Sequence, residues 1–153
     1  MPLTSDVLRE IGALSRTIHA ICDAKYKALK LQKGQFIFLT RICENRGVIM
    51  KDLSIMLKVD KTTTTKAVNK LIDRGYIHKE KDTKDQRVHR LYPNDKTLEI
   101  YDMLIEEENR AIAICFQGFT PDEKELVLTL VNRMKENIDQ DWREMKNYKG
   151  EKL

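Results

Sequence analysis

The stretch 51–92 constrains the fold more than any other part of this 153-residue chain. Its apolar residues recur at helical spacing and predict two short helices, at about 51–57 and 61–74. The segment 58–60 breaks the first helix, and Asp60 at its end is a residue type that caps helices. Two short helices joined by a tight turn predict a helix-turn-helix.

A hairpin is predicted directly after the second helix. Gly75 stands where that helix should end. The runs 76–81 and 86–92 indicate two strands joined by a polar tip. A helix-turn-helix followed at once by a hairpin is a more specific pattern than either part alone.

The remainder of the chain is predicted to be helical. Apolar residues at helical spacing indicate helices at about 5–28, 34–44 and 95–117. The run Thr120-Pro121-Asp122-Glu123 predicts the start of a last helix, because it combines a Thr cap, Pro at the first helical position and Glu at the third. With only 6 Gly and 3 Pro, a turn-rich β sandwich is disfavoured. The expected fold class is mainly α (α+β).

Charge is distributed unevenly along the chain. The net charge is only +4, yet residues 58–90 hold ten basic and five acidic side chains. Residues 91–153 hold nine basic and fourteen acidic ones. A local basic excess is the expected footprint of a phosphate-binding surface, although a solvated helical face would give the same count.

The predicted helix at 61–74 has two unlike faces on a helical wheel. The side chains expected to face the core are Thr64, Ala67, Val68, Leu71 and Ile72, together with Leu53, Met56 and Leu57 of the preceding helix. The opposite face carries Thr62, Thr63, Lys66, Asn69 and Lys70, with Thr65 at the boundary. Hydroxyls donate to phosphate oxygens and contact base edges, so this face is chemically suited to the major groove of DNA. The alternative is that the threonines only form the tight turn with Asp60.

The tip of the predicted hairpin is basic. Lys84 and Arg87 lie at or beside it, and an arginine there could enter a narrow minor groove, where negative potential is enhanced. Asp85 precedes Arg87 by two residues, close enough to orient the guanidinium through a hydrogen-bonded ion pair. The alternative is an ordinary solvated hairpin tip, which contributes little energy.

These motifs resemble those of the MarR family of bacterial winged-helix regulators. The matching residues run from Val59 to Lys66, from Leu71 to Ile77 and from Asp82 to Arg87. They are similar to the family's Val-Asp turn, its Ser/Thr-x-x-Thr-Arg/Lys recognition helix, its Gly-ended helix and its Asp-x-Arg wing. Further likenesses at 31–39 and 120–123 extend the resemblance over nearly the whole chain.

The resemblance implies one MarR-type domain over 1–153, which assembles as a homodimer. It implies a winged helix-turn-helix DNA-binding lobe at about 33–95, with the helix-turn-helix at about 51–74 and the wing at about 76–92. It also implies a helical dimerisation region at 1–32 and 96–153. A basic lobe and an acidic C-terminal dimerisation segment agree with the charge split.

The expected function is that of a sequence-specific transcriptional regulator, a ligand-responsive repressor that binds a palindromic promoter site in double-stranded DNA. By motif, the resemblance places Thr62, Thr65 and Lys66 on the DNA and Arg87 in the minor groove, positioned by Asp85. The helix face and the local charge add four more DNA-binding candidates, which are Thr63, Asn69, Lys70 and Lys84.

A small-molecule effector is a further expected partner, because many family members bind such molecules and others sense peroxide through a reactive cysteine. The sequence does not identify the effector. Cys22, Cys43 and Cys115 lie in apolar helical settings, which favours inert core thiols over sensors.

Other function classes are disfavoured. His19, His78 and His89 are scattered, and no spacing of ligand residues or glycine-rich motif indicates a metal site, a cofactor or an enzyme. No apolar run approaches the roughly 18 residues of a membrane span, and no signal peptide is evident, so a cytoplasmic location is expected. A protein-interaction module that keeps a winged helix without binding DNA is the remaining class, and the intact polar face and wing motif argue against it.

Overall fold

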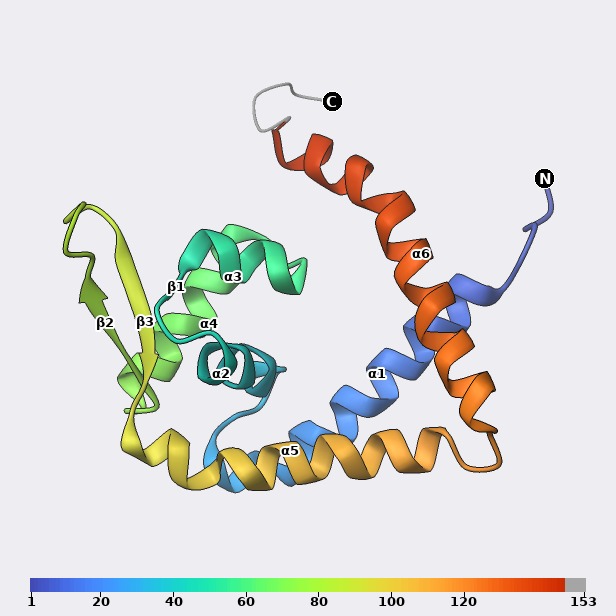
Figure 1. Cartoon of the computed structure of the whole chain (residues 1–153), viewed down its shortest axis with the longest axis horizontal. Helices are drawn as coiled ribbons and strands as arrows, with labels where there is room; N and C mark the ends of the chain where they lie inside the picture. Colours follow the sequence, from blue (N-terminus) through green and yellow to red (C-terminus); the bar gives the residue numbers. More distant parts are fainter. Residues whose placement is uncertain (148–153) are drawn as a thin grey trace. The chain divides into compact units, whose positions relative to one another are not determined.

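The computed structural model of the chain describes residues 1–147 (Figure 1). The chain divides into two compact units, residues 1–111 and 112–153, which are considered separately below. Residues 148–153, the end of the predicted dimerisation region, lie outside the described residues.

The helices of the first unit agree closely with the predicted ones. They are α1 (Val7–Lys25), the short 3-10 helix η1 (Lys27–Leu29), α2 (Gln35–Glu44), α3 (Met50–Leu57), α4 (Lys61–Asp73) and most of α5 (Asp95–Cys115). The first helix ends three residues earlier than predicted, because the chain tightens into η1 after Tyr26. The predicted stop at Gly75 is confirmed, since this glycine has φ +78°, a left-handed conformation that other residues adopt at a cost.

A three-stranded antiparallel sheet completes this unit. Its strands are β1 (Val48–Ile49), β2 (Ile77–Lys81) and β3 (His89–Pro93), in the order β1-β3-β2. The hairpin of β2 and β3 was predicted, whereas β1 was not, because two residues carry no periodic signal. The second predicted strand begins at His89 instead of 86, since residues 82–88 form the turns of the tip, with Asp82 N donating to the Val88 carbonyl.

One hydrophobic core holds the first unit together. It runs from Cys22 and Tyr26 in α1 through α2, α3, α4 and the sheet to Leu104 in α5. Helix α2 is central, since Leu39 and Ile42 have no exposed surface. The core therefore continues across both predicted boundaries of the DNA-binding lobe, at 32/33 and 95/96.

Two expectations about burial are wrong. Met56 was placed in the core, but it is 42% exposed, and Ser54 is buried beside Leu53 instead. The inward face of the short helix α3 therefore keeps Leu53 and the half-buried Leu57, but it extends toward Ser54 and not toward Met56. Cys115 was placed in an apolar core, but it is exposed at the end of α5.

The second unit consists of the end of α5 and the long helix α6 (Pro121–Asn147). The predicted capping box is confirmed: the Thr120 amide donates to Glu123 Oε1 at 2.9 Å, and the Glu123 amide donates to Thr120 Oγ1 at 3.2 Å. None of the described side chains of α6 is buried. Among the described residues, no helix is long and apolar enough to cross a membrane.

Candidate nucleic-acid interface

The start of helix α4 is fixed by Asp60. Its carboxylate accepts a hydrogen bond from the Thr63 amide at 2.7 Å on one oxygen and from the Thr63 hydroxyl at 2.9 Å on the other. Four threonines in succession disfavour a helix, because β-branched side chains lose rotamer freedom in it. The cap offsets this cost by satisfying a backbone donor that would otherwise have no partner.

The two predicted faces of α4 are present in the structure. Thr64, Ala67, Val68 and Leu71 are buried, and Ile72 is half-buried. The predicted contact residues Thr62, Thr63, Lys66, Asn69 and Lys70 are all exposed on the other side. Their neighbour Thr65 is half-buried, and its hydroxyl donates to the Lys61 carbonyl at 2.8 Å. The Thr65 hydroxyl hydrogen is therefore engaged by the helix itself.

The hairpin tip holds one arginine in a defined orientation. Asp85 Oδ1 accepts hydrogen bonds from the backbone N and the Nε of Arg87, both at 3.1 Å, and Oδ2 accepts one from Arg87 Nη2 at 3.3 Å. The Arg87 side chain is nevertheless 91% exposed. The hydrogen bonds from the Arg87 side chain and then from its amide lower the pKa of Asp85. The two charge-assisted hydrogen bonds to Asp85 thus fix the orientation of the Arg87 guanidinium while it stays exposed to solvent.

A second ion pair, which the sequence reasoning missed, supports the tip. Arg90 Nε donates to Asp82 Oδ1 at 2.7 Å, and Arg90 Nη1 donates to the Gly47 carbonyl at 2.9 Å. The other Asp82 oxygen accepts hydrogen bonds from the amides of Lys84 and Asp85. Asp82 opens the motif that contains Asp85 and Arg87, so it was visible in the sequence, whereas the link from Arg90 to Gly47 spans 43 residues and had no local signal.

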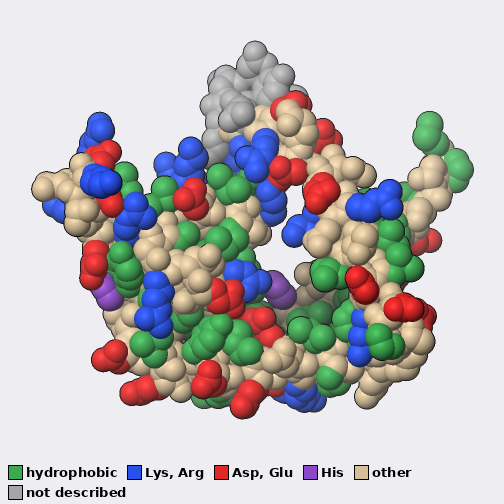
Figure 2. Space-filling model, viewed as in Figure 1, with side chains coloured by type: hydrophobic (Ala, Val, Ile, Leu, Met, Phe, Trp, Pro, Cys, Tyr) green, Lys and Arg blue, Asp and Glu red, His purple; other side chains and the backbone are tan. Residues whose placement is uncertain are grey.

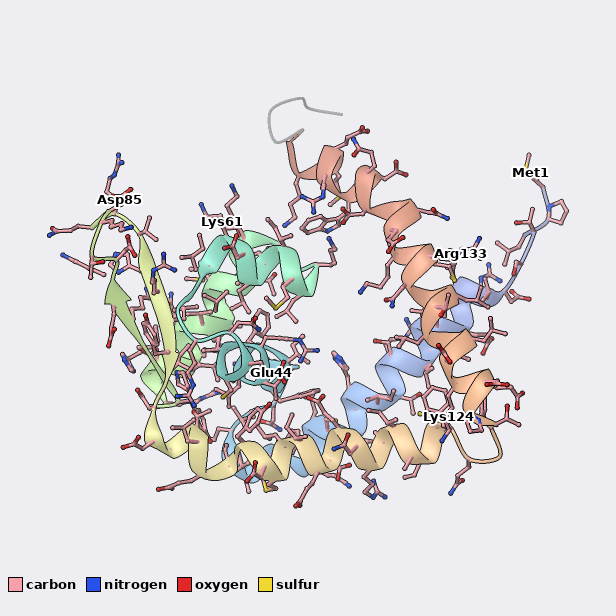
Figure 3. All side chains as sticks on the ribbon, in the orientation of Figure 1. Met1, Glu44, Lys61, Asp85, Lys124 and Arg133 are labelled. Atoms are coloured by element: carbon pink, nitrogen blue, oxygen red, sulfur yellow. The ribbon has the colours of Figure 1, made fainter. Side chains whose placement is uncertain are left out.

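The remaining predicted residue, Lys84, is exposed at the tip. Figure 3 places Asp85 at the end of the hairpin and Lys61 at the start of α4, both on the side of this unit away from α5. Figure 2 shows Lys and Arg side chains gathered at the tip. The first unit therefore offers a basic, hydroxyl-bearing helix face and a basic tip on one side, an arrangement suited to a phosphate backbone.

The thiols give a mixed picture. Cys22 is buried and Cys43 is half-buried. Burial raises the pKa of Cys22, and it raises that of Cys43 to about 11. Both thiols therefore stay protonated near neutral pH, which agrees with inert core residues. In the described part of the chain, no group of three His, Cys, Asp or Glu side chains is placed to hold a metal ion.

Comparison with known proteins places these features in a family. Residues 31–89 match the model of the MarR family. The chain is 38% identical over 148 residues to YybA, an uncharacterized HTH-type transcriptional regulator of Bacillus subtilis (strain 168), which covers 97% of each chain.

Solved structures agree. A MarR protein from Peptoclostridium difficile DA00132 is 56% identical, with a TM-score of 0.90 over 94% of each chain. A MarR family transcriptional regulator from Listeria monocytogenes, complexed with 26mer DNA, is 35% identical, with a TM-score of 0.92 over 98% of this chain and 100% of that one. The present chain belongs to the MarR family, has the winged helix-turn-helix fold and is a transcriptional regulator.

Proposed function

We propose that this regulator binds a palindromic promoter site in double-stranded DNA as a homodimer and represses transcription there, under the control of a small-molecule effector. The observation that carries the proposal is the shared placement, in one unit, of the exposed face of α4 and the preset Arg87. The Listeria relative complexed with DNA supports the choice of partner.

Each part of this surface has a distinct role in the proposed complex. Helix α4 enters the major groove, where Thr62 and Asn69 contact base edges and Lys66 and Lys70 contact phosphates. Thr63 lies at the helix start. Its hydroxyl donates to Asp60, so its oxygen remains available to accept a hydrogen bond from the DNA. Thr65 uses its methyl group and its oxygen lone pairs, because its hydrogen is bonded to the Lys61 carbonyl.

The wing contributes the second contact. Arg87, oriented by Asp85, enters the flanking minor groove, and Lys84 contacts a phosphate. Asp85 accepts hydrogen bonds from Nε and Nη2 of Arg87. The remaining N–H groups of the guanidinium therefore stay available to the DNA.

The homodimer is supported by the apolar surface that single helices leave uncovered. Helix α6 exposes six large apolar side chains, Leu126, Val127, Leu128, Leu130, Ile138 and Met145, each at least 38% exposed. Helix α1 likewise exposes Val7, Leu8, Ile11, Leu14 and Ile21. Apolar stripes of this kind on helices are buried in stable proteins, and a second copy of the chain would bury them. A two-fold dimer presents two recognition helices, which is why the proposed site is palindromic.

Effector control is supported by a pocket within the first unit. It has a volume of about 490 Å³ and lies between Lys25, Tyr26 and Leu29 on one side and Met103, Glu107 and Arg110 of α5 on the other. That volume is within the range of small-molecule sites, which combine apolar walls with a few polar groups. A bound molecule that changed the separation of the two recognition helices would weaken DNA binding, because both must fit the site together.

Selection of bound duplexes from a random DNA pool, followed by footprinting, tests the proposal. The expected result is a palindrome with half-sites about 10 bp apart, one helical turn. Placing that site across a promoter in a transcription assay should lower transcript yield in the presence of the protein. Recovery of no consensus, with only salt-sensitive background binding, would favour the interaction module instead.

A further inference from the structure

The connection between η1 and α2 is conformationally unusual. Within five residues, Lys30, Lys33 and Gly34 have positive φ angles of 56°, 59° and 71°. Residues other than glycine adopt this conformation at a cost in free energy, and they persist in it only where their surroundings hold them. Two lysines in that state therefore require an explanation from their neighbours.

Helix α4 supplies one of those neighbours from its C-terminal end. Arg74, the first residue after α4, uses one guanidinium nitrogen, Nη1, for two hydrogen bonds. One goes to the carbonyl of the left-handed Lys30, and the other goes to Oε1 of the buried Gln35 at 2.6 Å. Arg74 thus joins the end of the recognition helix to both ends of the strained connection.

Four further contacts reinforce this joint between Arg74 and residues 30–35. The Tyr76 hydroxyl donates to the Leu29 carbonyl of η1. On the other side, Lys96 in the first turn of α5 donates to the Arg74 carbonyl at 2.9 Å, and its ammonium lies 4.2 Å from the centre of the Tyr76 ring. From α1, Asp23 accepts the Gly34 amide at 3.1 Å. The connection is therefore held from α1 and from α4 at once.

We propose that Arg74, together with Gln35, is a positioning residue that locks the recognition helix to the 30–34 connection and so fixes where α4 stands relative to α1 and α5. This inference rests on the proposed function, because it assigns the joint a role in DNA reading. In a dimer built through the helices on either side of the joint, the position of α4 sets the separation of the two recognition helices. Arg74 then determines which half-site spacing the protein accepts, although it contacts no base.

Hydrogen exchange tests the joint without DNA. The amides of Lys30, Leu31, Gln35 and Ile37 are hydrogen-bonded in or beside the connection. Arg74→Met keeps the apolar stem and removes both hydrogen bonds. It should speed exchange at these amides by about tenfold or more, since each lost hydrogen bond contributes up to about a factor of ten. Lys27→Met is the matched control, because it removes an exposed positive charge from η1 and leaves the joint intact.

Spacing discrimination tests the role. The affinity of the wild type is measured for its selected duplex and for duplexes with one base pair added to or removed from the spacer. Arg74→Met and Gln35→Met should both reduce the ratio between these affinities by about tenfold, while the base preference within each half-site stays unchanged. Gln35→Met separates the joint from a charge effect, since it alters no charge.

The outcomes are distinguishable. Unchanged exchange in Arg74→Met, or wild-type spacing discrimination in both variants, overturns the inference while DNA binding stands. If the wild type itself selects no paired half-sites, the proposed function fails, and the exchange measurement still decides whether Arg74 holds the connection.

Discussion

Helices α4 and α6 are both amphipathic and both begin at a well-formed cap, yet they differ in what they leave exposed. Helix α4 buries four side chains in the core of its unit and exposes hydroxyls, an amide and lysines. The described residues of α6 bury nothing and expose leucines, a valine and an isoleucine. A free polar face is stable in water and is chemically suited to a charged partner, whereas a free apolar face indicates contact with another protein surface.

The comparison also separates two sources of helix stability. Helix α4 is held by its own core, so it can present its other face without a partner. A helix with no buried residue must gain its stability elsewhere, since isolated helices are marginal in water and tertiary packing supplies most of their stability. The second unit is therefore expected to depend on assembly, and the first is not.

The largest effect is expected on dimer assembly, from substitutions on the apolar face of α6. Leu126→Glu with Leu130→Glu places four charges on the proposed dimer surface, two in each copy. Because burying one leucine contributes roughly 1.5–3 kcal/mol, the dissociation constant of the dimer should rise by more than about 100-fold. Sedimentation equilibrium measures the change. Thr129→Glu with Asn132→Glu adds equal charge at exposed polar positions on the opposite side of α6 and should leave the dimer intact. An unchanged dimer in the leucine variant would refute the assignment of this face.

The next largest effect is expected on DNA affinity, from substitutions at the tip of the wing. Arg87→Ala should lower DNA affinity roughly 10- to 100-fold, the usual cost of a groove contact, without changing the melting temperature, since its side chain is 91% exposed. Asp85→Asn should cost less, because the arginine remains but loses its charged acceptor. Fluorescence anisotropy at fixed salt measures both, with the exposed neighbour Gln86→Ala as the control. Equal affinity of Arg87→Ala and the wild type would contradict the role given to the wing.

What the sequence predicted well depends on neighbours a few residues apart. The caps at Asp60 and Thr120 and the pairing of Asp85 with Arg87 all join groups two or three residues apart. The chemistry of such pairs is legible from the residue types and their spacing. The exposed and buried faces of α4 followed in the same way from helical periodicity.

What the sequence did not predict depends on groups that are distant along the chain. Strand β1 exists because Val48 and Ile49 pair with Leu91 and Arg90 of β3. Arg74 reaches back 44 residues to Lys30, over a connection whose left-handed lysines have no compositional signal. The orientation of Met56 was missed because periodicity over an eight-residue helix does not define the buried face.

A smaller effect tests whether the two caps serve equivalent helices. Asp60→Ala and Thr120→Ala each remove a side-chain cap, for which the usual cost is about 1 kcal/mol. In the first unit, the loss at Asp60 should lower the free energy of unfolding independently of protein concentration. At Thr120 the loss should depend on concentration, because α6 gains its stability through assembly. Chemical denaturation at two protein concentrations separates the cases, and a concentration-independent loss at Thr120 would show that α6 is stable without a partner.

The smallest effect is a pH dependence at the base of the wing. Asn94 Nδ2 donates to the Gly75 carbonyl at 3.0 Å, so its oxygen faces His78 Nδ1, and His78 Nε2 lies 3.1 Å from Glu80 Oε1. Two acceptors favour the doubly protonated ring, and the hydrogen bond to Asn94, followed by that to Glu80, raises the pKa of His78. A raised folded-state pKa gives a stabilisation that is complete below the ordinary value of about 6.5 and is lost as the pH rises through the folded-state value.

The melting temperature of the wild type relative to His78→Gln should therefore be higher at pH 6 than at pH 8. The difference should be less than about 3 °C, because the His78 side chain is 44% exposed and solvent weakens its bonds. His89→Gln removes the other histidine of the same hairpin, leaves the bridge in place and should retain the wild-type pH dependence. If the melting temperatures of the wild type and His78→Gln differ by the same amount at both pH values, the hydrogen bonds of His78 to Asn94 and Glu80 do not depend on its protonation. His78 would then contribute by packing on Tyr92, whose ring centre is 5.7 Å away. The melting temperature would then not depend on the protonation of His78.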